Sequence, residues 1–440
     1  MGVTTSLKKT IVVFFHGRHW LPLRATNEAH LKCWGRYSKH RVVYINVGFG
    51  VPWNLLRHLP IDVAIFDTIF LSMHWSPEYF LKHAEPCLPL KDVRCIKIAV
   101  PQDEFINIDY VVEFLNTIGV THILTCSDRN DWPVIYQNLD RNKVCLHTVL
   151  TGYVDETQLK RWNHLPPSRR ETDIGYRAWD NPYWLGQHGR RKVEIGRAVG
   201  SAARSRGFRV DVTYPPTVSF LQGAKWLRFL AGCRAVLGVE GGASVLDKDG
   251  SIKQRVEGYL AEHPNASFEE TRDQCFPDED HAINLACLSP RHFEACITRT
   301  CQILLEGSYN GVFQPWRHYI PLKNDYSNLD EVFKALADDS LVDRITEQAY
   351  EDIISSGKWS YRKFVKDVEE TIIDPTERVP SFLSLSGWVV YALLRLRGRM
   401  LWTYAHFEAS RSGKSFLPIV RQWYCVPRRV LSRVKRMMVA

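Results

Sequence analysis

The segment from Glu306 to Gln314 combines residue types that suit a phosphate-bearing ligand. An expected buried strand, Gln302–Leu305, ends in the acid Glu306, and two glycines, Gly307 and Gly311, follow it. A carboxylate at a strand end can accept hydrogen bonds from sugar or ribose hydroxyls, and glycines let backbone amides approach phosphate oxygens. The sequence therefore predicts a ligand-binding turn here, with an ordinary strand–turn–helix connection as the alternative.

This segment resembles the donor-binding motif of glycosyltransferases of the GT-B class. That motif opens with Glu-Gly and ends in a second Glu after seven intervening residues; Glu306 matches the first acid, and Gln314 stands in place of the second. The resemblance is to the group 1 and sporulation-protein (CgeB-like) glycosyltransferases. It extends to two further segments, Pro321–Leu329 and, earlier in the chain, Pro101–Phe105.

The resemblance covers most of residues 10–372, most strongly 301–330, and implies a nucleotide-sugar donor site without a metal or other cofactor. It implies that residues of the Glu-Gly turn bind the donor: Glu306, Gly307, Asn310, Gly311 and Gln314. Gln314 can hydrogen-bond a ribose but lacks the charge of a second Glu. Retention, which is usual for the double-Glu class, and inversion of the sugar configuration therefore both stay open.

Three basic residues could neutralise the diphosphate that leaves the donor. Arg177 lies at the end of the expected strand Asp173–Ala178, and Arg190 and Lys192 come just before the helix expected at Lys192–Ser205. Cations placed there would do the task that a metal performs in metal-dependent transferases. The resemblance implies basic residues in this region, and a solvated surface charge is the alternative for each one.

A second acid-plus-glycine turn, Glu240-Gly241-Gly242, follows the apolar run Ala235–Val239. Its amides could line the nucleotide or the sugar, and a plain tight turn is the alternative. The nearby Asp247-Lys-Asp249 has the DxD pattern of metal-dependent transferases, but it fits a turn equally well. We expect no metal.

The N-terminal lobe is expected to bind the acceptor, with His16 and His19 after its first strand facing the cleft. If the transfer inverts configuration, a general base must take the proton of the acceptor hydroxyl, and a His or a carboxylate can do so. His16, Asp103 and Glu104 are the candidates. A loop hydrogen bond or a helix cap is the alternative role for each.

Apolar runs alternate with helix-compatible stretches in two successive segments, which predicts two Rossmann-like α/β lobes with parallel sheets. The strands expected in the first lobe, residues 1–164, are Thr10–Phe15, Arg41–Val47, Val63–Leu71, Cys95–Val100, His122–Cys126 and Val144–Val149. Those expected in the second lobe, residues 172–352, are Asp173–Ala178, Phe208–Thr213, Ala235–Val239, Gln302–Leu305 and Tyr319–Leu322. The polar stretch 250–285 is expected to be an insertion or a mobile lid, and a closing helix is expected in 353–374. Such lobes bind a ligand in the cleft at the carboxyl ends of their strands.

The C-terminal residues 381–440 form a basic tail. From Arg378 to Ala440 there are 12 Lys and Arg and one acid, against 45 basic and 47 acidic residues in the rest of the chain. The longest apolar run, Leu385–Leu394, is too short to span a bilayer, and Trp, Tyr and Leu alternate with the basic residues. This pattern favours amphipathic helices on an anionic membrane surface over nucleic-acid binding. Helices packed on the body of the protein are the remaining alternative.

The 11 cysteines are scattered without CxxC pairs, which favours reduced thiols and a cytoplasmic protein. No signal peptide is recognisable.

Together these features favour a metal-independent glycosyltransferase of the hexosyltransferase type, peripheral to the inner face of the membrane, with a saccharide acceptor that is lipid-linked. Such an enzyme would serve cell-surface polysaccharide biosynthesis. The alternatives are a nucleotide-sugar epimerase of the same fold and a non-catalytic protein that binds sugars or nucleotides.

Overall fold

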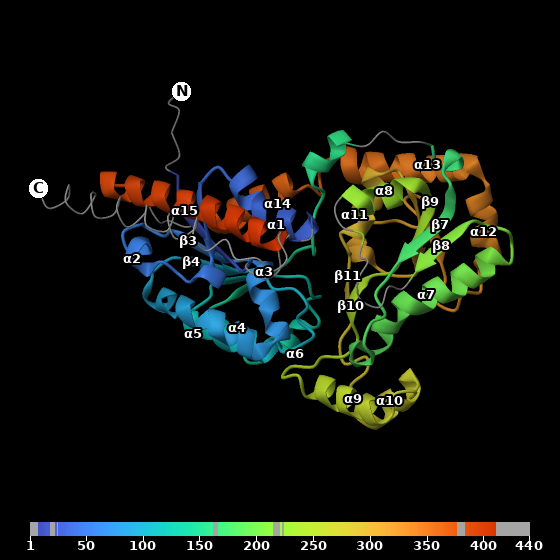
Figure 1. Ribbon diagram of the computed structural model, residues 1–440, viewed down its shortest axis with the longest axis horizontal. Helices are drawn as coiled ribbons and strands as arrows, with labels where there is room; N and C mark the ends of the chain where they lie inside the picture. Colours follow the sequence, from blue (N-terminus) through green and yellow to red (C-terminus); the bar gives the residue numbers. More distant parts are fainter. Residues whose placement is uncertain are drawn as a thin grey trace, which may run out of the picture.

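The computed structural model describes residues 8–17, 23, 25–161, 166–213, 221, 224–375 and 383–410. His19 and the part of the tail after Ser410 lie outside the described residues. Two α/β lobes lie side by side, connected by a linker at the top of the view and by a helical insertion at the bottom (Figure 1).

Six parallel strands form the sheet of the first lobe, in the order β2-β1-β3-β4-β5-β6. They are β1 (Thr10–Phe15), β2 (Arg41–Asn46), β3 (Val63–Phe66), β4 (Ile96–Ala99), β5 (His122–Thr125) and β6 (Cys145–Thr148). The helices of this lobe are α1 (Ala25–Tyr37), α2 (Trp53–Leu56), α3 (Thr68–Leu71), α4 (Pro77–Ala84), α5 (Ile108–Ile118) and α6 (Trp132–Ile135). Strands β1, β3 and β4 are completely buried, because helices cover both faces of the sheet.

All six strands expected in this lobe are present, but the third is shorter than its apolar run. The run Val63–Leu71 divides at Asp67, whose side chain accepts a hydrogen bond from the amide of Ile69 and caps α3. A capping aspartate ends the strand although the residues after it are apolar.

The sheet of the second lobe is also parallel, in the order β13-β12-β9-β7-β8. Its strands are β7 (Thr172–Arg177), β8 (Val210–Thr213), β9 (Cys233–Gly238), β12 (Cys301–Leu305) and β13 (Ile320–Leu322). Its helices are α7 (Gly186–Arg204), α8 (Ala224–Gly232), α11 (Arg291–Ile297), α12 (Leu329–Ala337) and α13 (Asp339–Ala349).

Helix α7 begins six residues earlier than the sequence suggested, at Gly186 instead of Lys192. Arg190 and Lys192 therefore lie inside the helix, and the expectation that they precede it was wrong. Glycines have low helix propensity, so Gly186 and Gly189 concealed the first turns.

The polar stretch after β9 is a folded insertion. A two-stranded antiparallel ribbon, β10 (Gly241–Ala243) and β11 (Leu285–Cys287), carries α9 (Ser251–Glu262) and α10 (Phe268–Cys275). Buried side chains of both helices belong to the same hydrophobic core as the first lobe. The backbones of Phe105 and Asp247 are hydrogen-bonded (2.8 Å), as are those of Asp247 and Asn107 (2.7 Å). The insertion thus ties the second lobe to the first across the cleft.

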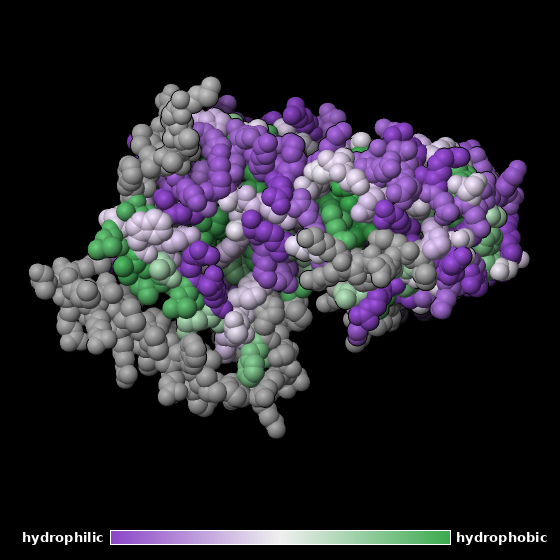
Figure 2. Space-filling view, turned by 90° about the horizontal axis from the view of Figure 1, so that it is seen from above, coloured by the Kyte–Doolittle hydropathy of each residue, from purple (hydrophilic) through white to green (hydrophobic). Residues whose placement is uncertain are grey.

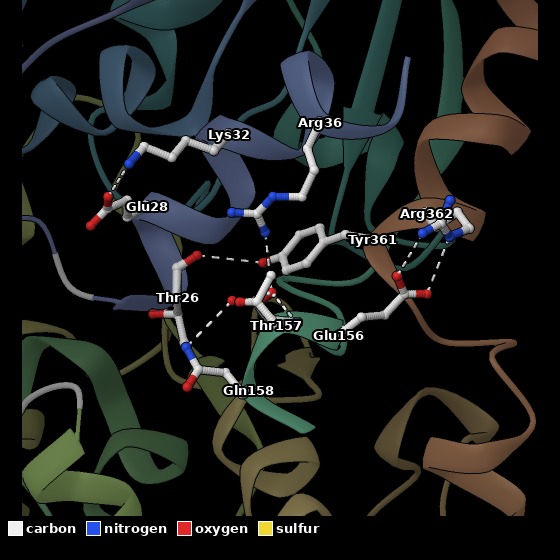
Figure 3. Close-up of polar contacts among 10 residues, drawn as sticks. Thr26, Glu28, Lys32, Arg36, Glu156, Thr157, Gln158, Tyr361 and Arg362 are labelled. Carbon is white, nitrogen blue, oxygen red and sulfur yellow. Dashed lines mark hydrogen bonds and ion pairs between the residues drawn. The ribbon is translucent and has the colours of Figure 1, made fainter. Parts of the chain in front are cut away.

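The chain crosses back to the first lobe through α14 (Tyr361–Val368) and a following π-helical turn (Glu369–Ile373). Figure 3 shows polar contacts among α1, the linker and α14. The hydroxyl of Tyr361 donates to the carbonyl of Thr26 (3.4 Å), and Arg362 pairs with Glu156 of the linker (3.2 Å). These contacts attach α14 to the first lobe on the side of the cleft opposite the insertion (Figure 1).

The described part of the tail is one helix, α15 (Leu385–Ser410), and it packs on the edge strand β2. Leu394, Leu401 and Ala405 are buried, and Arg397 donates to the carbonyl of Phe49 (3.2 Å). This segment is therefore an element of the first lobe, which was the alternative left open by the sequence.

Candidate active site between the lobes

The strand order of the second sheet reverses between β7 and β9, and the loops after these strands bound a crevice at the carboxyl edge of the sheet. A small pocket lies beside the reversal, with walls that include Arg177, Trp226, Phe229 and Arg291. The guanidinium carbon of Arg177 lies 4.2 Å from the centroid of the Phe229 ring, and that of Arg291 lies 5.7 Å from the Trp226 ring. Aromatic rings and cations therefore line this edge of the lobe.

Glu240, directly after β9, binds the turn that follows Glu306. Its Oε1 accepts hydrogen bonds from the Tyr309 amide (2.6 Å) and the Ser308 hydroxyl (3.0 Å), and its Oε2 accepts from the Ser308 amide (3.2 Å). A Cβ at Gly307 would lie 2.3 Å from that Oε2, so the close approach requires glycine. The amides of Ser308 and Tyr309 therefore donate to Glu240 within the second lobe.

Two side chains of the Glu306–Gln314 motif are open to a ligand. Glu306 is exposed, and its Oε2 accepts a hydrogen bond from the Asn324 amide (3.1 Å). Gln314 is also exposed. Asn310 instead accepts a hydrogen bond from the backbone amide after β11 (2.7 Å), with a left-handed φ of 51°, so it shapes the turn.

The Gly241-Gly242 pair forms β10 of the ribbon. Gly242 has a φ of 110°, and a Cβ there would lie 1.6 Å from the carbonyl oxygen of Leu285. The carbonyl of Gly241 accepts from Nε2 of His188 (3.1 Å). Burial lowers the pKa of His188 to about 4, with Lys192 and Arg191 acting in the same direction, so the ring donates as the neutral imidazole.

Two of the three basic residues singled out above are paired within the second lobe. Arg177 Nη2 lies 2.7 Å from a carboxylate oxygen of Asp211. Arg190 is buried, and its Nη1 lies 2.9 Å from a carboxylate oxygen of Asp180. Both guanidinium groups thus form ion pairs with carboxylates of their own lobe.

Lys192 is different, because it makes no hydrogen bond or ion pair with any residue that the structure describes. Burial lowers its pKa and Arg291 lowers it further, whereas Cys287 and, from the first lobe, Asp103 act to raise it. Lys192 is half-buried, and a cation partly withdrawn from water without a direct partner is costly unless a ligand compensates it. Such perturbed groups in a cleft are candidates for functional sites.

Asp103 approaches this cation from the first lobe, in the loop after β4. Its Oδ2 accepts a hydrogen bond from Nε1 of Trp75 (3.1 Å), and its φ of 58° is left-handed. A left-handed conformation costs energy for a residue other than glycine and is common at functional sites. The carboxylate of Asp103 thus acts on the pKa of Lys192 from the opposite lobe, although no hydrogen bond or ion pair joins the two side chains in the described part of the chain.

Glu104 and His16 lie deeper. The Glu104 side chain is fully buried, accepting hydrogen bonds from Thr125 and from the Tyr136 hydroxyl (2.9 Å), and burial raises its pKa to about 7. His16 is 1% exposed, with Nε2 3.0 Å from the Tyr79 hydroxyl. Neither is as accessible to a substrate as Asp103.

Arg291 and His188 were not anticipated. Arg291 begins α11 and donates to the carbonyl of Arg177 (3.1 Å), so it connects the pocket with the vicinity of Lys192. The Ser-Pro before Arg291 signals a helix start, but no local pattern shows that this start meets the ends of β7 and β9.

Within the described ranges, no group of three or more His, Cys, Asp or Glu side chains could hold a metal ion. In the same part of the chain, none of the helices has both the length and the apolar character needed to cross a membrane.

No protein-family model and no curated protein matches the sequence. Solved structures do match. An alpha-glucosyltransferase in complex with UDP-glucose and DNA is 11% identical, with 85% of this chain and 100% of that chain covered and a TM-score of 0.50. Anabaena HepE in complex with UDP is 9% identical, with 83% and 99% covered and a TM-score of 0.45. TarM is 12% identical with a TM-score of 0.38, and the match covers 70% of this chain but only 54% of TarM.

At these low identities the structural match shows the fold alone. The chain has the GT-B architecture of two Rossmann-like lobes, as the sequence predicted, and it resembles glycosyltransferases of that architecture over nearly its whole described body.

Proposed function

We propose that the protein is a glycosyltransferase that moves a sugar from a nucleotide-sugar donor, held mainly by the second lobe, to a saccharide acceptor at the first. The observation that carries the proposal is Lys192 of the second lobe, a cation without a direct partner among the described residues, whose pKa Asp103 of the first lobe acts to raise. The alpha-glucosyltransferase of the same fold binds UDP-glucose, which supports a UDP-sugar donor.

The chemistry follows from the charges. The acceptor hydroxyl attacks the anomeric carbon, the bond from that carbon to the phosphate oxygen breaks, and the nucleoside diphosphate leaves with additional negative charge. Lys192 and Arg291 stabilise this charge without a metal. Glu306 accepts hydrogen bonds from donor hydroxyls. If the transfer inverts configuration, Asp103 takes the proton of the acceptor, since Glu104 and His16 are buried.

Incubation with UDP-, GDP-, dTDP- and CMP-sugars tests this function. We expect release of a nucleoside diphosphate with one donor class, and a substantially lower rate for Glu306→Gln, whose exposed side chain leaves the fold intact. Interconversion of sugars without release would instead identify an epimerase. Binding of the donor without either reaction would identify a binding protein.

We further propose that the enzyme acts at the inner face of the membrane on a lipid-linked saccharide. Leu385, Trp388 and Leu396 are 84%, 50% and 50% exposed, and with Arg395 and Arg399 they follow one face of α15. Figure 2 shows hydrophobic residues gathered at one end of the first lobe. Arginines beside exposed apolar residues suit an interfacial helix. Eight of the basic tail residues lie beyond Ser410.

Flotation with phosphatidylglycerol-containing vesicles tests this surface. The variant Leu385→Ser/Leu396→Ser and the variant Arg395→Gln/Arg399→Gln should each bind several-fold more weakly than the wild type, the second one mainly at low salt. Leu81→Ser is the control, because Leu81 is 43% exposed on α4 of the same lobe. Equal flotation of all four proteins would exclude the α15 face. Removal of all residues after Pro380 is unsuitable, since it uncovers the edge strand β2.

A further inference from the structure

The backbone of Gln314 is held mainly by His318, and the Arg317 amide also donates to the Gln314 carbonyl (3.4 Å). The Gln314 amide donates to Nδ1 of His318 (3.1 Å), and the His318 amide donates to the carbonyl of Gln314 (2.9 Å). The carboxamide of Gln314 has no hydrogen-bond partner among the described residues, and the side chain is exposed. The backbone of Gln314 is thus fixed by hydrogen bonds, whereas its side-chain carboxamide is available to a ligand.

His318 is held in one tautomer. Since Nδ1 accepts from Gln314, the ring proton is on Nε2, which donates to Oδ2 of Asp352 (3.0 Å). His318 is 4% exposed, so water does not compete for these contacts. Asp352 also accepts from Nε of Arg317 (2.7 Å) and Nε2 of Gln348 (3.1 Å). The hydrogen bond from His318 and the contacts with Arg317 and Gln348 lower the pKa of Asp352 to about 2, which keeps it a carboxylate.

Asp352 lies in a π-helical turn, Tyr350–Ser355, that continues α13. A π-turn inside a helix is uncommon and occurs frequently at functional sites. Here it presents the carboxylate that orients His318. A chain of hydrogen bonds therefore runs from α13 through Asp352 and His318 to the backbone of Gln314.

We propose that His318 and Asp352 are positioning residues that hold the Gln314 carboxamide toward the ribose hydroxyls of the donor; this rests on the proposed function. The physical reason is that Gln314 lacks the negative charge of the second Glu of the donor-binding motif. A neutral hydrogen bond is roughly half as strong as one to a carboxylate, and ordering a free glutamine side chain costs conformational entropy. Because the amide and the carbonyl of Gln314 are both hydrogen-bonded, fewer conformations of its side chain are accessible before the ligand binds, and the entropic cost of binding is smaller.

The test compares binding of UDP and of 2′,3′-dideoxy-UDP to the full chain by calorimetry. Wild type should prefer UDP, and Gln314→Ala should lose roughly fivefold to tenfold in UDP affinity while its affinity for the dideoxy compound stays the same. His318→Phe keeps the ring volume but cannot accept from the Gln314 amide, so it should show a similar loss of preference. His318→Asn offers an acceptor oxygen and should restore part of it. The double variant Gln314→Ala/His318→Phe should be no worse than Gln314→Ala.

In kinetics, the variants should raise KM for the donor with little change in kcat. A purely structural role would lower the melting temperature of His318→Phe and leave the preference for UDP unchanged, and this result would overturn the proposal. Equal binding of both nucleotides by wild type and Gln314→Ala would overturn it as well, even if His318→Phe misfolds. If wild type releases a nucleoside diphosphate from its donor but these ratios do not change, the positioning proposal fails and the glycosyltransferase function stands.

Discussion

Replacing Lys192 by methionine is expected to lower kcat by about 10²–10³-fold, the range found when one preorganised group that stabilises transition-state charge is removed. The ammonium group lies near Asp103 and Arg291 and has no direct partner among the described residues. The diphosphate would provide the missing partner only when donor is bound, and most strongly when the sugar departs. Methionine keeps the length and the apolar contacts of the side chain, so the loss would be of charge alone.

The same substitution is expected to leave the free energy of unfolding unchanged or raise it, because a desolvated charge without a direct partner opposes folding. Arg190→Met is the matched control, since Arg190 is two residues away on α7, buried, and paired with Asp180 and the carbonyl of Asn181. It should lose about 1–3 kcal/mol of stability from the broken hydrogen bonds, with a much smaller effect on kcat. Chemical denaturation and steady-state rates separate the two variants. A stable, fully active Lys192→Met enzyme would remove Lys192 from the site.

The sheets were predictable because their strands are buried on both faces. Continuous apolar runs identify such strands, and the predicted Thr10–Phe15 and Gln302–Leu305 differ from β1 and β12 by at most one residue. The predicted strand ends differ from the structure where a polar residue ends a strand inside an apolar run, as Asp67 does by capping α3. The helices of the insertion were not foreseen, although Ser267 and Glu270 form a capping box that marks the start of α10.

The site was harder to predict from the sequence, because its geometry depends on contacts between residues that are far apart in the chain. The acid-glycine turns were recognised separately, yet nothing local shows that Glu240 binds the amides of Ser308 and Tyr309. Likewise, the sequence does not distinguish the basic residues of one segment, and only the fold shows that Arg190 has an acid within reach while Lys192 has no direct partner among the described residues. Burial and pairing are properties of the tertiary structure.

Glu104→Gln is expected to change how stability depends on pH. Burial raises the pKa of Glu104 from 4.5 to about 7 in the folded protein, and Oε2 has no hydrogen-bond partner among the described residues. Between these two pH values the folded protein holds a proton that the unfolded chain has released, so stability falls as the pH rises through that window. Since one pKa unit corresponds to 1.36 kcal/mol, the full loss is about 3 kcal/mol and is complete above pH 7.

The glutamine variant cannot ionise, so its unfolding free energy should lack this decrease and exceed that of wild type at pH 8. Urea denaturation between pH 4.5 and 8 measures the difference in slope. Glu113→Gln on α5 removes an exposed carboxylate and should keep the wild-type slope. If Glu104→Gln kept that slope too, Glu104 would be ionised in the folded protein and stabilised by a group other than Thr125 and Tyr136. Turnover at pH 8 should survive the substitution, because the Glu104 carboxyl is fully buried and bonded to Thr125 and Tyr136. A loss of turnover without loss of stability would instead make the buried acid the proton acceptor.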